Sequence, residues 1–155
     1  MTVFLICFLL GCLTGLRSMT APAVVCWAAH LGWLHLEGTN LAFIGHPATL
    51  IVFTLLALLE LIADKLPNTP ARTAPPGLIA RIVFGSLCGV AVVTSAGGSL
   101  LVAAIFSAIG ALVGAFGGYN IRKALVLRAH LPDFGVALSE DVIAIASGLL
   151  IISHV

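Results

Sequence analysis

The sequence predicts an all-α integral membrane protein with about five transmembrane helices, in a single domain covering residues 1–155. Three observations predict this class: 61% of the residues are hydrophobic, only 8% are charged, and the mean hydropathy is +1.20. Soluble proteins carry about 25% charged residues, so this chain lacks the polar surface that water requires. The formal net charge of +1 leaves no basic surface for nucleic acid.

Five apolar segments are candidates for membrane spans, since a spanning helix needs about 20 apolar residues. They cover residues 3–34, 48–66, 78–96, 99–121 and 135–153. Gly- and Pro-containing stretches separate them, and these are typical of loops: residues 38–40, 45–47, 67–76, 96–98 and 130–135.

The first segment is too long for one ordinary span and is interrupted by the polar stretch RSMTAP at residues 17–22. Thr20 suits the cap of a helix that carries Pro22 in its first turn. We therefore expect either one helix broken near residues 17–22 or two short half-spans.

Two acids interrupt the apolar segment 48–66. Glu60 and Asp64 lie four residues apart, so both carboxylates project from one face of a helix. A charge inside a span costs about 2.5–3.5 kcal/mol, so such residues face a bundle interior or a cavity and find a partner. If the first segment is a single span, Arg17 lies near the membrane midplane and needs an acid or an anion. Its expected partners are Glu60, Glu140 and Asp141.

Glu140 and Asp141 are adjacent, so on a helix their side chains diverge by about 100° and only one is expected to face such a cluster. Asp141 shares a small-residue face with Ala137, Ala144 and Gly148, which is typical of helix packing. Alternatively, these acids lie at the membrane interface and stabilise the positive N-terminal end of their helix.

Glycines spaced four apart predict close approach of helices in three segments. The predicted packing residues are Gly11, Gly15, Gly85, Gly89, Gly110, Gly114 and Gly118. With the small size of the chain, these glycine faces also predict a homo-oligomer.

The sequence also contains a candidate internal repeat. Residues 11–15 (GCLTG) and 29–31 (AHL) resemble residues 110–114 (GALVG) and 129–131 (AHL). Because the copies fall in the first and fourth predicted helices, they are expected to run in opposite directions, as in the inverted repeats of many transporters.

Basic residues predict the orientation, because cytoplasmic loops carry an excess of Lys and Arg. They concentrate after the second and fourth segments: Lys65, Arg72, Arg81, Arg122, Lys123 and Arg128. Loops 67–77 and 122–133 are therefore expected in the cytoplasm and the C-terminus in the periplasm. Five spans place the N-terminus inside, whereas two spans in residues 3–34 move it outside. Either way, the charged groups of the helices approach the cytoplasmic face.

Four parts of the sequence resemble those of a known protein family: GLRSMTAP at residues 15–22, LELIADKLP at 59–67, GAFGGY at 114–119, and the pair Glu140-Asp141. With them, nearly the whole chain resembles the bacterial domain-of-unknown-function family 4126. The resemblance implies a multi-pass bacterial membrane protein and no substrate or reaction, and we expect the inner membrane as its location.

The preferred function is a small transporter or channel for an ion or small solute. The candidate binding or coupling residues are the polar groups expected inside the membrane: Arg17, Ser18, Thr20, Glu60, Asp64, Arg81, Arg122, Glu140 and Asp141. A half-helix N-terminus beside Arg17 suits an anion, whereas the carboxylates suit a proton, a cation or an internal salt bridge. The residues leave these alternatives open.

Two other functional classes remain. Arg17, Arg81 and Arg122 could hold the phosphate of a lipid headgroup in an enzyme or binder, and the charges could instead fix helix register in an assembly subunit. The sequence has no HEXXH, no DxxxD metal motif and no nucleophile beside a histidine base, so it does not favour an enzyme. The four cysteines lack CxxC spacing, and no metal or cofactor is expected. The expected partners are membrane lipid, an ion or solute, and further copies of the chain.

Overall fold

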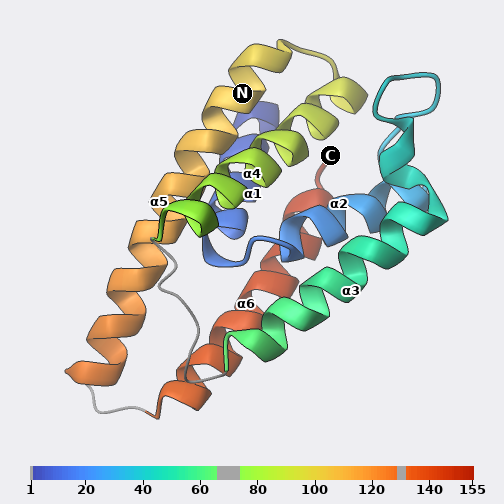
Figure 1. Cartoon of the computed structure of the whole chain (residues 1–155). Coiled ribbons are helices and arrows are strands. Elements are labelled where there is room, and N and C mark those ends of the chain that lie inside the picture. Colours follow the sequence, from blue (N-terminus) through green and yellow to red (C-terminus); the bar gives the residue numbers. More distant parts are fainter. Residues whose placement is uncertain (1, 66–73, 129–131) are drawn as a thin grey trace.

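The computed structural model describes residues 2–65, 74–128 and 132–155 (Figure 1). The described residues form helices and contain no strand, so the all-α prediction is confirmed. The elements in chain order are α1 (Thr2–Leu16), α2 (Thr20–His30), the short 3-10 helix η1 (Ala42–Gly45), α3 (Pro47–Ala63), α4 (Pro75–Ala96), α5 (Leu100–Leu127) and α6 (Asp133–Ile152).

The first predicted segment is broken, and residues 17–19 separate α1 from α2. Met19, rather than Thr20, holds the N-cap position of α2, and no side chain of its own segment caps it. Pro22 lies in the first turn of α2, where a proline removes no intrahelical hydrogen bond. The expected cap by Thr20 is therefore wrong, because Thr20 is already helical.

The chain turns back at this break. Phe4 at the start of α1 lies beside Gly98 in the turn between α4 and α5, because a Cβ on Gly98 would be 3.6 Å from Phe4 Cζ. The segment after α2 returns to the same end, where the His35 backbone N–H donates to Ser95 Oγ at 2.8 Å. The start of α1 thus lies at the end of the molecule where α4 meets α5, as expected for two half-spans and not for one span.

Helices α1, α4 and α5 form a tightly packed bundle, and its contacts run through glycine. A Cβ on Gly11 would lie 2.8 Å from the carbonyl carbon of Ser107, and one on Gly85 would lie 2.6 Å from Thr14 Oγ1. Such distances are too short for any side chain, so only glycine permits this approach. The seven glycines predicted to pack are all buried within the chain: Gly11, Gly15, Gly85, Gly89, Gly110, Gly114 and Gly118. They therefore give no support to an oligomer, which stays a prediction.

Helices α1 and α5 run in the same direction. Gly11 faces Ser107, and Gly15, one turn further along α1, faces Ala111 and Ala115 further along α5. The two glycine strings of the candidate repeat therefore lie side by side and parallel, and the expected opposite orientation is wrong. Residues 129–131, the end of the second copy, lie outside the described residues.

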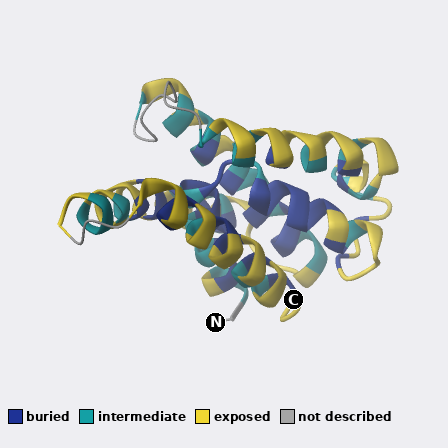
Figure 2. Cartoon of the chain, turned by 90° about the horizontal axis from the view of Figure 1, so that it is seen from below, coloured by how far each residue is buried: buried dark blue, intermediate teal, exposed yellow. Residues whose placement is uncertain are grey.

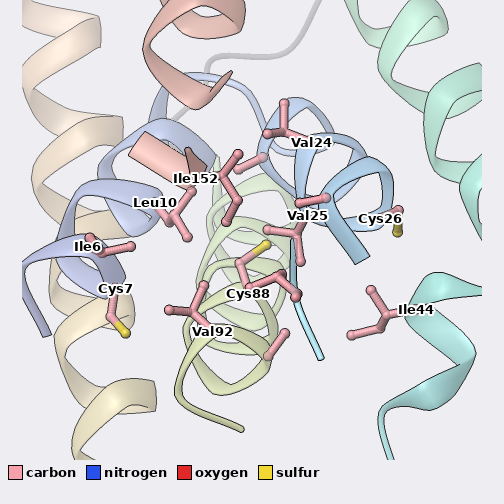
Figure 3. Close-up of a cluster of buried hydrophobic side chains, with 14 of the residues drawn as sticks. Ile6, Cys7, Leu10, Val24, Val25, Cys26, Ile44, Cys88, Val92 and Ile152 are labelled. Atoms are coloured by element: carbon pink, nitrogen blue, oxygen red, sulfur yellow. The ribbon is translucent and has the colours of Figure 1, made fainter. Parts of the chain in front are cut away.

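The second group of helices, α2, α3 and α6, packs beside this bundle (Figure 1). An apolar core joins the two groups, and Leu10, Val25, Val92 and Ile152 meet in it (Figure 3). The outer helix faces remain exposed (Figure 2) and are rich in large apolar residues, among them Ile51, Leu55, Leu59 and Ile62 on α3. An exposed apolar surface of this kind suits contact with lipid.

Among the described residues, three helices, α4, α5 and α6, are long and apolar enough to cross a membrane, judged by length and composition, whereas the apolar helices α1 and α3 are shorter. The chain is therefore a membrane-associated helical protein, and the prediction of five spanning helices is not confirmed. The predicted loops are shorter than expected: residues 75–77 belong to α4, residues 122–127 to α5 and residue 133 to α6. Residues 67–73, the rest of the first loop, lie outside the described residues.

Candidate functional site

The break between α1 and α2 leaves backbone groups that no helix satisfies, and charged side chains from other helices bind them. The Glu60 carboxylate on α3 accepts hydrogen bonds from the backbone N–H groups of Ser18 at 2.7 Å and Met19 at 2.8 Å. At the end of α1, the Gly15 carbonyl accepts a hydrogen bond from Arg81 Nε at 3.1 Å. An acid thus sits at the positive end of α2 and a cation at the negative end of α1, as helix dipoles favour.

Arg17 lies between these two helix ends, and its side chain is completely buried. Its Nη1 pairs with Asp64 Oδ2 at the end of α3, and its Nη2 pairs with Asp141 Oδ1 on α6. The second oxygen of Asp141 accepts a hydrogen bond from Lys65 Nζ at 2.7 Å. We call Arg17, Glu60, Asp64, Lys65 and Asp141 the buried charge cluster.

Local sequence explains why α6 presents Asp141 to this cluster. Asp141 shares its helix face with Ala137, Ala144 and Gly148, and all four residues are buried. These small residues let α6 approach α2, and a Cβ on Gly148 would lie 3.3 Å from Val24 Cγ2. The adjacent Glu140 points elsewhere, as the helical angle between neighbours requires.

A second network joins the end of α5 to the start of α6. Arg122 donates two hydrogen bonds to Asp133, from Nε at 2.9 Å and from Nη2 at 2.8 Å. Glu140 Oε2 lies 3.7 Å from Arg122 Nη1. The Asp133 side chain is 59% exposed, whereas those of Arg122 and Glu140 are 19% and 13% exposed, so the network reaches the surface only at Asp133.

The structure thus divides the predicted site residues. It brings Arg17, Ser18, Glu60, Asp64 and Asp141 together, and Arg81 binds the adjacent helix end. Arg122 and Glu140 belong to the surface network instead. Thr20 is buried with α2, and its hydroxyl has no hydrogen-bond partner among the described residues.

Sequence reasoning missed three of these relationships. Asp64 was not among the partners expected for Arg17, although its spacing from Glu60 places both acids on one helix face. Lys65 and Asp133 were not considered as site residues, yet each pairs with a predicted one. Lys65 and Asp133 could have been identified from their places in the sequence, because Lys65 directly follows the acid-bearing segment and Asp133 begins the helix after Arg122.

The cluster contains charged groups of both signs. Two cations, Arg17 and Lys65, face the carboxylates of Asp64 and Asp141, while Glu60 is held by backbone N–H groups. In the part of the chain that the structure describes, no group of three His, Cys, Asp or Glu residues is arranged to hold a metal ion.

Comparison with known proteins gives one match. A family model described as a domain of unknown function, DUF4126, matches residues 4–154. No curated protein and no solved structure matches the chain.

Proposed function

Because the chain belongs to the DUF4126 family, a domain of unknown function, we propose its role from the geometry of its buried charges: it is a small membrane transporter or channel for protons or a small cation. One observation carries the proposal. Arg17 is completely buried at the break between α1 and α2, where it pairs with carboxylates from two other helices, α3 and α6.

Stability alone is a weak reason for such a cluster. Replacing a buried ion pair by well-packed apolar residues is often neutral or stabilising by about 1–4 kcal/mol. Ionisable groups among apolar helices most often mark ion pathways or proton relays. The buried charge cluster therefore supports a role in moving charge.

The arrangement favours a cation over an anion. The two positions that would attract an anion are the N-terminus of α2 and the guanidinium of Arg17. Glu60 already occupies the first. Asp64 and Asp141 form ion pairs with the second, whose Nε and Nη2 have no hydrogen-bond partner among the described residues. A proton or small cation can instead bind a carboxylate and compete with Arg17 or Lys65 for it.

The position of the cluster, between two groups of helices, supports coupling of ion binding to a movement of α6. Arg17 follows α1, whose backbone closely contacts that of α5 and whose Thr14 side chain packs against Gly85 of α4. Its partners Asp64 and Asp141 belong to the other helix group. Neutralising Asp141 would weaken its attraction to both Arg17 and Lys65, so proton or cation binding would loosen α6 from the break. In this proposal, that loosening opens the pathway.

Of the two alternatives, the structure favours the assembly role more. Arg17 and Arg81 donate to acceptors within the protein, so neither is arranged for a lipid phosphate. The ion pairs do connect separate helices, which is the specific observation in favour of a purely structural cluster. The two roles differ in one measurable property, because only a transporter moves ions across a sealed bilayer.

The test is ion flux into liposomes that contain the purified protein. A pH-sensitive dye and tracer ions report proton, Na⁺, K⁺ and Cl⁻ movement for the wild type and for D64N and D141N. D133N is the matched control, since it removes the same type of carboxylate from the surface network. We expect proton or cation flux in the wild type and D133N and its loss in D64N. D141N mimics the neutral state that loosens α6, so it should conduct without control by pH or cation concentration. Folded wild-type protein that moves none of these ions would contradict transport and favour the assembly role.

A further inference from the structure

The ammonium group of Lys65 is held between two oxygen atoms that belong to different helices. Its Nζ donates to Asp141 Oδ2 of α6 at 2.7 Å and to the Leu61 carbonyl of α3 at 2.9 Å. The Lys65 side chain is 23% exposed, against 6% for Asp141, so the ammonium group lies at the accessible edge of the buried charge cluster. A positive charge thus already occupies a position formed by a carboxylate and a main-chain oxygen.

The end of α3 explains why the Leu61 carbonyl can accept a cation. In a continuing helix this carbonyl would accept a hydrogen bond from the backbone N–H of Lys65, four residues later. That N–H donates instead to the Ile62 carbonyl at 3.1 Å. Carbonyl groups in the last turn of a helix carry the negative end of its dipole, so they attract positive charge. In secondary transporters, the C-terminal ends of interrupted helices coordinate Na⁺ in this way.

The Asp141 carboxylate has further capacity to bind a cation. An ionised carboxylate offers about four lone-pair positions, and Lys65 uses one of them on Oδ2. Oδ1 forms the ion pair with Arg17 but has no hydrogen-bond partner among the described residues. Carboxylate and carbonyl oxygens are also the ligands that hard metal cations prefer. A free cation can therefore use the two oxygens that now hold the ammonium group.

The charge of the cluster favours a monovalent ion. Its two cations, Arg17 and Lys65, face three carboxylates, those of Glu60, Asp64 and Asp141. Exchange of the ammonium group for a monovalent ion keeps this balance, whereas a divalent ion adds positive charge close to Arg17. Ca²⁺ also takes about six to eight oxygen ligands, more than the two that hold the ammonium group among the described residues.

We propose that Lys65 is a tethered substitute for a free monovalent cation, and that K⁺ or Na⁺ binds Asp141 Oδ2 and the Leu61 carbonyl by displacing the ammonium group. The inference rests on the proposed function and deepens it, because it names the class of ion and its position. Lys65 also explains how the ion leaves. Departure from a buried carboxylate would leave a negative charge without its partner, and the returning ammonium group compensates it. The site thereby holds its ion weakly enough for conduction.

The wild-type protein tests the displacement directly, because the chain contains only two lysines, Lys65 and Lys123. Lys123 is exposed on α5 and serves as the control within the same molecule. The protein in lipid nanodiscs is labelled briefly with an amine-reactive ester at constant ionic strength, while K⁺ or Na⁺ replaces choline. Peptide mass spectrometry measures the labelling of each lysine. We expect labelling of Lys65 to rise saturably by about tenfold, the effect of losing one hydrogen bond to a charged group, while that of Lys123 stays constant.

Variants make the test specific to this position. D141N removes the carboxylate, so Lys65 should be labelled rapidly in choline and should not respond to K⁺ or Na⁺. D133N is the matched control, since Asp133 pairs with Arg122, and it should keep the wild-type response. K65M removes the competing ammonium group. Its thermal unfolding midpoint should rise at lower K⁺ or Na⁺ concentrations than that of the wild type, and addition of D141N to K65M should abolish this response.

Labelling of Lys65 that does not depend on either ion would overturn the proposal, as would an equal dependence in D141N. The result is independent of the flux test. Flux without ion-dependent labelling would contradict this site and leave transport standing. Ion-dependent labelling without flux would support the site and contradict transport.

Discussion

Asp141 and Arg17 form a buried ion pair that joins the middle of α6 to the break between α1 and α2. The same carboxylate also binds Lys65 just after α3. One acid therefore holds together three parts of the chain that are far apart in sequence. Because Asp141 pairs with both Arg17 and Lys65, replacing one of these residues by a neutral one removes an ionic partner from another.

Arg17→Gln should destabilise the protein much more than Arg122→Gln. Removing Arg17 leaves the carboxylates of Asp64 and Asp141 with one fewer cation in a buried site, which costs about 3–5 kcal/mol. Arg122 pairs with Asp133, whose side chain is 59% exposed, so water can solvate this carboxylate once Arg122 is removed and the loss should be smaller. Reversible unfolding in mixed detergent micelles measures both losses. Equal losses would show that burial of Arg17 adds nothing.

Glu60→Ala should loosen the start of α2. The variant removes the acceptor of the part-buried Ser18 and Met19 N–H groups, and a hydrogen bond of this kind contributes about 0.5–1.5 kcal/mol. Hydrogen exchange of a peptide covering these two residues should become faster, while peptides from α5 stay protected. Glu37→Ala is the control, because Glu37 is exposed in the segment after α2. Unchanged exchange in Glu60→Ala would remove Glu60 from this capping role.

The sequence predicted, for local reasons, the break and the expectation that only one of Glu140 and Asp141 faces the cluster. The polar stretch at residues 17–22 interrupts an apolar run, and Asp141 shares its face with small residues. Both patterns lie within one helix or one turn, so periodicity and composition are sufficient to find them.

The relationships between distant segments were not predictable in this way. Residues 17–22 predict a break but not the direction of the chain after it. The observed reversal places Arg17 against Asp64. The cap of α2 comes from Glu60 on another helix, so the local candidate Thr20 was the wrong choice. The parallel arrangement of α1 and α5 likewise depends on the path of the whole chain.

Gly11→Ala should destabilise the bundle of α1, α4 and α5. The new Cβ would lie 2.8–2.9 Å from backbone atoms of Ser107, and backbone cannot move aside as a flexible side chain can. Overpacking of this kind costs about 1–3 kcal/mol. Gly117→Ala is the matched control, since a Cβ there meets nothing within 4 Å, and it should leave thermal stability in detergent unchanged or raised. A similar change in both variants would mean that α1 and α5 do not touch at Gly11.

The membrane orientation can be tested with single cysteines in a variant without the four native ones. Ser99 lies in the uncharged turn between α4 and α5, the end at which α1 begins, and Thr69 lies in the stretch between Lys65 and Arg81. Because basic residues stay on the cytoplasmic side, a membrane-impermeant maleimide should label Ser99→Cys in intact bacterial cells. It should label Thr69→Cys only after the cells are lysed. The reverse pattern would place the basic stretches in the periplasm, and labelling of both cysteines in intact cells would mean that α4 does not cross the membrane.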